Sequence, residues 1–298
     1  MKIGISGNIG EFTSKVPHLA RFIEDAGFES LWAGEHIIVP VHIANPVRHG
    51  TMLPESYKHM PDMFITLAYA AAGTSKLRLG TSICLVPQRN PLILAKEVAT
   101  LDQFSNGRFI FGIGHGWIFE EAGIMGVPWD KRVKMTNECI QALKTIWTEA
   151  EAEFRGEFFT FPPIISNPKP VQKPHPPIIL GSGDGTIDNS RIIRRVAEIA
   201  DGWMPLALTP AQAKAQLNEL KSLCKARQRD FTKMDIGIIN GAQILDPKRL
   251  TMPVEELIAE YDAAGVGRLI FAMGRHDNES DFKRQVEAVA QSTGLVRG

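Results

Sequence analysis

Cysteine is scarce in this sequence. Its three cysteines, Cys84, Cys139 and Cys224, are odd in number and far apart. This spacing fits neither a disulfide framework nor a zinc site of the Cys-x-x-Cys type. We therefore expect three reduced thiols.

The sequence also has no excess of charge of either sign and no long apolar run. Its 33 basic residues balance its 33 acidic residues, which argues against a nucleic-acid or anionic-membrane partner. No apolar run approaches the roughly 18 residues that span a bilayer, and the first residues lack the apolar core of a signal peptide. We expect a cytoplasmic protein whose partner is a small molecule.

What the sequence does contain is a regular alternation of short β-rich apolar runs with longer segments of helical period. This alternation predicts parallel strands joined by crossover helices. The eight expected strands are Lys2 to Gly7, Ser30 to Gly34, Leu77 to Ile83, Arg108 to Gly112, Pro177 to Gly181, Gly202 to Pro205, Asp235 to Gln243 and Arg268 to Phe271. Eight such units in 298 residues predict an α/β fold, a (β/α)₈ TIM barrel that forms a single domain over residues 1–298.

Two stretches exceed the minimal repeat, Ile37 to Pro61 and Glu151 to Pro176. We interpret both as surface insertions. The first leaves directly from the end of the second strand, so we expect it to cover the catalytic face, where the carboxyl ends of barrel strands lie.

The second strand ends in Glu35 and His36, an acid and a base side by side. Histidine titrates near neutral pH and a carboxylate can tune it, which makes the two residues candidates for proton transfer. A structural ion pair or a helix cap is the alternative. The third strand ends in Gly80-Thr81-Ser82-Ile83-Cys84, where a small polar residue leaves room for a flat ring, although a plainly packed strand explains the run as well.

Glycine-rich turns follow the fourth and fifth strands. The fourth ends in Gly112-Ile113-Gly114-His115-Gly116-Trp117, which does not match the Rossmann fingerprint. The fifth runs into Gly181-Ser182-Gly183-Asp184-Gly185 before a helix. Backbone amides and a helix N-terminus make such a turn a phosphate site, and a plain turn would need fewer glycines. The spacing of His42, His49 and His59 fits no tight ligand set, so we expect no metal.

Four segments carry a family resemblance: GFESLWAGEH, LRLGTSICLVPQRNPLILAKEVATLDQFSNGRFIFGIGHGW, FPPIISNPKPVQKPHPPIILGSG and EIADGWMPL. Through them the sequence resembles the luciferase-like monooxygenase superfamily, particularly its branch of coenzyme F420-dependent oxidoreductases. The resemblance covers most of the chain. It implies a bacterial luciferase-like barrel whose flavin or deazaflavin ring lies over the barrel mouth, with the cofactor phosphate near the fourth and fifth strands.

The resemblance also implies roles for single residues. Glu35 and His36 would contact the ring region or transfer protons, and a non-prolyl cis peptide bond between Ser82 and Ile83 would lie against the ring. His115 and Gly116 would approach the phosphate or side chain of the cofactor, and Gly181, Ser182 and Gly183 would form the phosphate turn. Some deazaflavin-dependent sugar dehydrogenases have an acid where this chain has Trp117, so their acid-base scheme does not transfer. His36 is our candidate for that task.

Three functions follow from these expectations. The first is hydride transfer between coenzyme F420 and an organic substrate, in which the protein orients the ring. The second is an FMN-dependent monooxygenase on the same fold. The third is a barrel that binds the cofactor without turnover, because a fold does not fix a function. The resemblance further implies a homodimer.

Overall fold

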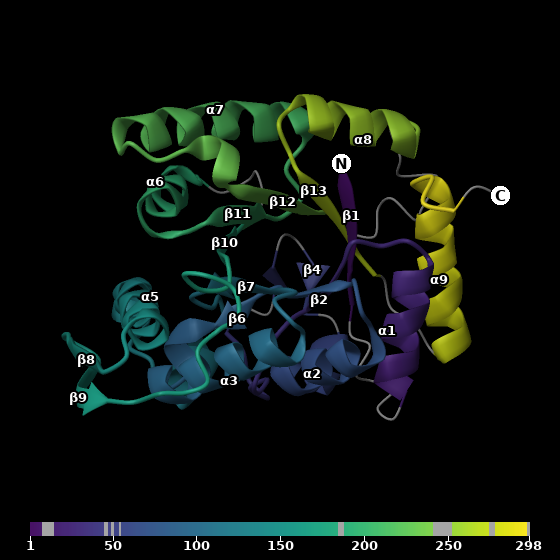
Figure 1. Ribbon diagram of the computed structural model, residues 1–298. Helices are drawn as coiled ribbons and strands as arrows, with labels where there is room; N and C mark the ends of the chain where they lie inside the picture. The colour runs from purple at the N-terminus through teal and green to yellow at the C-terminus, as the bar shows by residue number, and fades with distance from the viewer. Residues whose placement is uncertain are drawn as a thin grey trace.

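Eight parallel strands close into a barrel in the computed structural model, which describes residues 1–7, 15–44, 47–48, 51–53, 55–183, 188–240, 252–273 and 278–296. The barrel strands are β1 (Lys2–Ser6), β2 (Ser30–Ala33), β5 (Arg78–Thr81), β7 (Phe109–Gly114), β10 (Ile178–Ser182), β11 (Gly202–Pro205), β12 (Asp235–Asn240) and β13 (Arg268–Ala272). They follow one another in this order around the barrel, and pairing of β10 with β7 and of β13 with β1 closes it. The predicted TIM barrel is confirmed (Figure 1).

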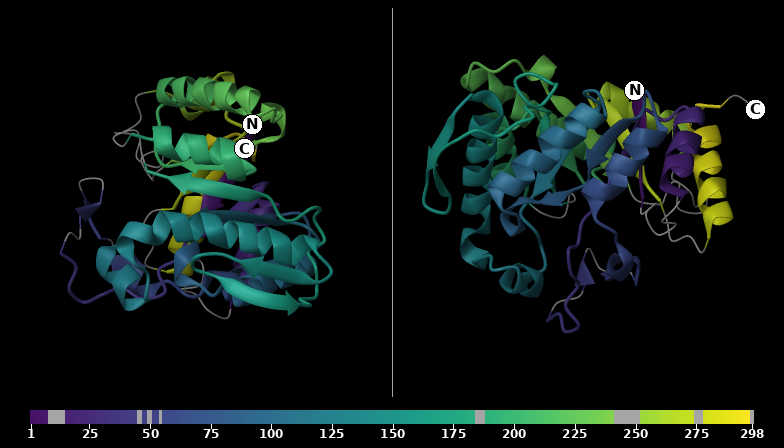
Figure 2. Two further views of the ribbon diagram at one scale, coloured as in Figure 1. Left: turned by 90° about the vertical axis from the view of Figure 1, so that its left-hand side faces the viewer. Right: turned by 60° about the horizontal axis from the view of Figure 1, so that its bottom comes forward.

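Helices surround the barrel on the outside (Figures 1 and 2). Those described are α1 (Val16–Asp25), α2 (Met63–Gly73), α3 (Pro91–Phe104), α4 (Phe119–Ile124), α5 (Arg132–Thr148), α6 (Ser190–Ile199), α7 (Pro210–Ala226), α8 (Val254–Ala263) and α9 (Glu279–Ser292). Local chemistry starts several of them: Asp62 and Asn90 accept hydrogen bonds from the first turns of α2 and α3, and Thr209 forms a capping box with Gln212 on α7.

The eight predicted strands all occur. The sequence predicts that the seventh strand reaches Gln243. Strand β12 is described as far as Asn240, and Gln243 lies outside the described residues. The helix predicted after the fifth strand is α6, which begins at Ser190 after its N-cap, Asn189. The third strand is shorter than predicted, since β5 ends at Thr81 and does not reach Ile83. A short strand outside the predicted range, β6 (Cys84–Leu85), follows and pairs with β7.

Both insertions carry secondary structure that periodicity does not predict. The first contains a small antiparallel pair, β3 (Val47–Arg48) with β4 (Thr51–Met52), and the 3₁₀ helix η2 (Glu55–His59). The second contains an antiparallel hairpin, β8 (Ala152–Arg155) with β9 (Thr160–Ile164), beside α5. Prolines in β9 do not prevent pairing, because this two-stranded ribbon has an open edge on each strand.

A tightly packed apolar cluster fills the inside of the barrel, and a larger one lies between the strands and the helices. The inner cluster consists of Trp32, Ile110, Ile179, Met204, Ile239 and Ile270. The Trp32 ring needs glycine opposite it, since a Cβ at Gly80 would overlap its six-membered ring. Trp32 Nε1 donates to Ser30 Oγ at 2.9 Å, which satisfies the buried indole.

The three cysteines are free and buried, as expected. Across the described ranges, no helix is long and apolar enough to cross a membrane. No group of three or more His, Cys, Asp or Glu side chains there has the geometry to hold a metal ion, and His49 lies outside those ranges.

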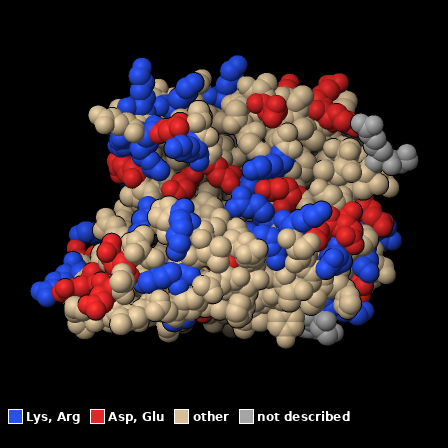
Figure 3. Space-filling view, viewed as in Figure 1, with Lys and Arg blue, Asp and Glu red and all other residues tan. Residues whose placement is uncertain are grey.

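One face of the outer helix layer is unusually apolar. Helices α2 and α3 pack side by side, and four large apolar side chains on them are exposed: Ile65 at 64%, Tyr69 at 54%, Leu92 at 38% and Ile93 at 61%. Figure 3 shows the corresponding lower part of the molecule with few charged side chains. We call these four residues the α2–α3 face.

Candidate active site

The carboxyl ends of the barrel strands form a partly exposed ring above the buried core. The residues at or just after these ends are Ser6, Gly34, Ser82, His115, Ser182, Leu206, Asn240 and Ala272. The preceding strand residues are almost all buried. Catalytic groups of TIM barrels lie at this end of the barrel, so the structure brings the expected site residues to the appropriate face.

The peptide bond between Ser82 and Ile83 is cis, as the resemblance implies. It lies where β5 ends and the chain turns toward β6. The Ile83 side chain packs on the inner barrel cluster. Ser82 Oγ lies 3.1 Å from Ser6 Oγ across the rim.

Two glycines make room for Ile83. A Cβ at Gly114 would overlap Ile83 Cδ1, and a Cβ at Gly181 would lie 2.9 Å from Ile83 Cγ2 and 3.1 Å from Cδ1. Gly112 has a separate reason, since a Cβ there would overlap the Thr81 carbonyl. Packing around the Ser82–Ile83 bend therefore accounts for Gly114, and also for Gly181, which the resemblance assigns to the phosphate turn.

Gly116 differs from these glycines because it has a φ of 80°, a left-handed conformation that favours glycine. Its nearest neighbour, measured from an ideal Cβ, is Gln88 Nε2 at 3.7 Å. Gln88 is itself buried, and its Oε1 has no hydrogen-bond partner among the described residues. A buried amide oxygen without a partner is costly, so this region offers an unused acceptor close to the mouth.

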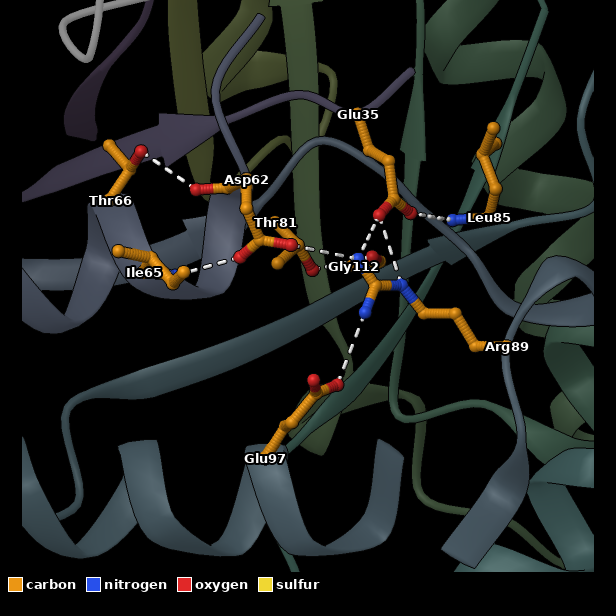
Figure 4. Close-up of polar contacts among 9 residues, drawn as sticks. All are labelled: Glu35, Asp62, Ile65, Thr66, Thr81, Leu85, Arg89, Glu97 and Gly112. Atoms are coloured by element: carbon orange, nitrogen blue, oxygen red, sulfur yellow. Dashed lines mark hydrogen bonds and ion pairs between the residues drawn. The ribbon is translucent and has the colours of Figure 1, made fainter. Parts of the chain in front are cut away.

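Glu35 lies in a buried ion-pair network (Figure 4). Its Oε2 accepts a hydrogen bond from the Leu85 amide at 2.7 Å, and its Oε1 accepts from Arg89 Nε at 3.0 Å and also from Arg89 Nη2. Arg89 further contacts Glu97 at 3.1 Å and Asp62 at 3.3 Å. The Glu35 side chain is only 4% exposed.

This network joins the end of β2, the segment after the cis bond, the N-cap of α2 and the body of α3. Each Glu35 oxygen already has a partner in it, and the surrounding carboxylates, Glu35 foremost, raise the pKa of Arg89 against the opposing effect of burial. Burial raises the pKa of the neighbouring Glu97. The arrangement matches the structural ion pair that the sequence left open for Glu35.

His36 makes a different contact. Its Nδ1 lies 2.9 Å from Glu121 Oε2, and the two side chains are 6% and 0% exposed. The imidazole stacks on Tyr57 at 4.9 Å between ring centroids and meets Trp117 edge-on at 6.1 Å. Glu35 and His36 are thus adjacent in sequence, but their side chains belong to two separate networks.

Helix α4 connects this histidine to the first insertion. Glu121 holds His36, and the preceding Glu120 accepts a hydrogen bond from the Ala44 amide at 2.8 Å. Tyr57 comes from η2 of the same insertion. The insertion therefore contacts the catalytic face beside His36, in agreement with its expected position.

The charges of two arginines, Arg195 and Arg132, act on His115, which follows β7. Burial, then the charge of Arg195, then that of Arg132 lower the pKa of His115 to about 4. Arg195, on α6, donates to Asn137 Oδ1 at 2.8 and 3.1 Å, and Arg132, at the start of α5, donates to the Trp129 carbonyl at 2.6 Å. Within the described ranges, neither guanidinium has a carboxylate partner, and Arg132 Nε is buried without a hydrogen bond.

Arg132 also lies over the Trp129 ring at 3.6 Å. Two arginines that make no salt bridge within the described ranges, near an imidazole whose pKa is lowered, are suited to an anion, since phosphate binds bidentately to arginine. The nearby turn after β10 adds Ser182 and Gly183. Ser182 Oγ accepts from Trp203 Nε1 at 3.1 Å. Asp184 and Gly185, the remainder of the expected phosphate turn, lie outside the described residues.

Nothing in the sequence indicates that four residues of this site belong to it. Glu121, Arg89, Arg132 and Arg195 lie on helices or in loops where charged residues are ordinary. His36 and Glu121 are 85 positions apart, so only the closed barrel brings them together. The acidic pair Glu120-Glu121 near a helix start suggests at most a favourable first turn.

The geometry defines a TIM-barrel protein with a buried His36–Glu121 pair, and with His115 under the influence of two arginines, at the carboxyl ends of the barrel strands. The family model of luciferase-like monooxygenases matches residues 10–291, and the chain belongs to that family.

Relatives and solved structures agree with this membership. An uncharacterised protein of Mycobacterium tuberculosis, Rv0953c, is 34% identical over 259 residues, covering 85% of each chain. The oxygenase component of flavin-dependent trigonelline monooxygenase from Acinetobacter baylyi is 33% identical over 230 residues, 76% of this chain and 58% of that protein. The solved structure of an F420-dependent secondary alcohol dehydrogenase has a TM-score of 0.74 at 18% identity and covers 100% of this chain and 99% of that one. The last likeness concerns the fold.

Proposed function

We propose that this luciferase-like oxidoreductase transfers a hydride between coenzyme F420 and an organic substrate. The observation that carries the proposal is the arrangement of the barrel mouth. An apolar bend at Ser82–Ile83 lies between the His36–Glu121 pair on one side and the cationic group of His115, Arg132 and Arg195 on the other. A tricyclic ring with a phosphate-bearing side chain has apolar, proton-exchanging and anionic parts that would face these three groups of residues. The segments that resemble the F420-dependent branch support the same cofactor.

The residues present fit such a cofactor. Ile83 offers an apolar surface for the ring, and the unpartnered Gln88 Oε1 offers an acceptor at the rim. His115, Gly116, Ser182 and Gly183 lie where the phosphate side chain would pass, while Gly181 contributes by making room for Ile83. When bound, the deazaflavin supplies or accepts the hydride.

The remaining chemistry belongs to the protein. We assign proton transfer to His36, whose Nε2 has no hydrogen bond from any residue in the described part of the chain. We assign Glu35 a positioning role, because both of its oxygens already bind Leu85 and Arg89. The first insertion, through Tyr57, shields His36 from water.

A second candidate is an FMN-dependent monooxygenase. The observation in its favour is the 33% identity with a flavin-dependent monooxygenase component. FMN shares the tricyclic ring and the ribityl phosphate with F420, so the same residues would hold it.

The test is a pair of binding titrations on the purified protein, with F420 and with FMN, followed by ligand fluorescence. F420 binding that is much tighter than FMN binding supports the first proposal, and the reverse order supports the second. Binding without turnover of any accepted substrate leaves a non-catalytic barrel.

Matched variants make the titration specific to the proposed anion site. Arg195→Gln removes one of its cations, whereas Arg194→Gln removes the exposed neighbour on the same helix. We expect Arg195→Gln to weaken cofactor binding about tenfold and Arg194→Gln to leave it unchanged, since a charge-assisted hydrogen bond contributes roughly 1.5–3 kcal/mol. We also expect Gly183→Val to weaken binding by crowding the phosphate turn. If both arginine variants bind the cofactor with equal affinity, the cofactor phosphate does not bind at Arg195.

We further propose that the protein is a homodimer that associates through the α2–α3 face. Monomeric proteins rarely leave several large apolar side chains exposed on neighbouring helices without a function. The helix α2 is apolar on nearly all sides, although only part of it faces the barrel.

A further inference from the structure

We propose that Glu121 is a positioning residue for His36. It holds the imidazole with its hydrogen on Nδ1, which leaves Nε2 as the atom that accepts a proton from the substrate side. Its catalytic meaning rests on the proposed oxidoreductase function, whereas the tautomer itself is a property of the protein alone.

The direction of the hydrogen bond follows from its partners. An ionised carboxylate only accepts hydrogen bonds, so with Glu121 ionised the 2.9 Å contact between its Oε2 and His36 Nδ1 places the hydrogen on Nδ1. In a neutral imidazole the other nitrogen is then unprotonated. Free histidine favours the opposite form, with the hydrogen on Nε2. The protein must therefore impose this tautomer, and Glu121 is the group that does so.

The burial of Glu121 shows that the contact has a cost. The side chain is fully buried, and its second oxygen, Oε1, has no hydrogen-bond partner among the described residues. Burying a carboxylate with one oxygen unsatisfied is destabilising, and such a group is expected to be paired. His36 is the partner that the structure gives it, and a positive charge on His36 would be balanced there.

Apart from Glu121, the residues that contact His36 orient its imidazole ring through aromatic contacts. Tyr57 from η2 stacks on one face of the imidazole, and Trp117 from the segment after β7 meets it edge-on. Glu120, the other acid of α4, binds the Ala44 amide instead. Glu121 is thus the acidic side chain in contact with the imidazole, and Tyr57 is the other titratable side chain that contacts it.

The consequence for the reaction is a single proton transfer. The bond between the proton and its substrate atom breaks, the bonding pair stays on that atom, and the proton forms a new bond to the lone pair of His36 Nε2. The resulting imidazolium remains hydrogen-bonded through Nδ1 to Glu121, which stabilises the positive charge. The reverse reaction returns the same proton from Nε2.

The first experiment measures the tautomer without any cofactor. Protein labelled with ¹⁵N-histidine is studied by long-range ¹H–¹⁵N correlation at a pH where His36 is neutral, and the His36→Gln variant assigns the signals. We expect wild-type His36 to carry its hydrogen on Nδ1. In Glu121→Gln we expect a shift toward the Nε2–H form, in Glu121→Asp partial retention, and in the control Glu120→Gln no change. A wild-type signal of the Nε2–H type, or an identical signal in Glu121→Gln, would overturn the proposal.

The second experiment uses the loaded enzyme. We expect Glu121→Gln to lower kcat on the order of 10²-fold, the size of a general acid–base contribution, with KM and cofactor affinity unchanged and with partial recovery in Glu121→Asp. Lowered cofactor affinity with unchanged kcat would contradict a positioning role. If His36→Gln retains full turnover, the catalytic role of His36 fails, while the tautomer measurement still decides whether Glu121 holds it.

Discussion

The Ile83 side chain occupies the space that a side chain at Gly114 would need, and Gly181 borders it on another side. Gly114→Ala would therefore force the Ile83 side chain to move. Beside Gly181 there is no free space to receive the displaced side chain. Overpacking of this kind costs about 1–3 kcal/mol. We expect this loss in the free energy of unfolding of Gly114→Ala, measured by urea denaturation, together with weaker cofactor binding.

A double-mutant cycle tests the cause of that loss. In Ile83→Ala the space is open, so adding Gly114→Ala should then cost much less than in the wild-type background. The control is Gly123→Ala on α4, where nothing lies within 4 Å of a Cβ, and we expect it to be neutral or stabilising. Additive losses in the cycle would mean that Gly114 is constrained by something other than Ile83.

The Arg89 network predicts that substitution of the buried Arg89 lowers the free energy of unfolding much more than substitution of the partly exposed Glu97. Arg89→Met leaves Glu35 buried without its cation, which typically costs about 3–5 kcal/mol. Glu97→Gln removes a carboxylate that is 33% exposed, and we expect a loss of about 1 kcal/mol or less. The double variant Glu35→Gln with Arg89→Met should be more stable than Arg89→Met alone. Equal losses at Arg89 and Glu97, measured by urea denaturation, would show that burial of Glu35 does not decide the energy.

His115 predicts an acid-sensitive fold. Its pKa in the folded protein is lowered to about 4, below the 6.5 of an ordinary histidine. The unfolded chain therefore binds a proton more readily, so this contribution is fully present above pH 6.5 and is lost as the pH falls toward 4. The shift corresponds to at most about 3 kcal/mol.

The measurement is the unfolding free energy of the apoprotein between pH 7 and pH 4. We expect His115→Gln to lose less stability over this range than wild type, and the exposed His18→Gln to behave like wild type. Parallel curves for His115→Gln and wild type would remove His115 as the cause. The negative charge of a bound phosphate should offset the positive charges of Arg195 and Arg132 and so raise the pKa of His115. We therefore expect cofactor binding at low pH to be accompanied by proton uptake.

The α2–α3 face predicts a dimer that charge can separate. We expect light scattering to give a dimer for the wild type and a monomer for Ile65→Glu combined with Ile93→Glu, because two buried carboxylates on each subunit oppose association. Ile165→Glu, at another exposed apolar residue, should remain dimeric. A monomeric wild type, or a folded double variant that remains dimeric, would exclude this face.

The sequence by itself determined the architecture of this protein. Strand and helix periods are local, and eight βα units close into a barrel, so the order of strands and the catalytic end followed from Lys2 to Phe271 without any coordinates. The cis bond at Ser82–Ile83 was accessible only through family resemblance, because nothing in the local pattern distinguishes it. The hairpin β8–β9 was missed, since its short strands contain prolines and lack clear alternation.

The tertiary structure decided which of the rim residues act together. Glu35 and His36 are neighbours in sequence, yet successive residues at a strand end project in different directions, and one side chain joins Arg89 while the other joins Glu121. The partners come from β-α loops and helices some 50 to 85 positions away, a distance at which sequence patterns carry no information. Parallel pairing of β2 with β5, and of β5 with β7, places them within hydrogen-bonding distance. Glu35 thereby joins a structural ion-pair network, and Glu121 binds the histidine.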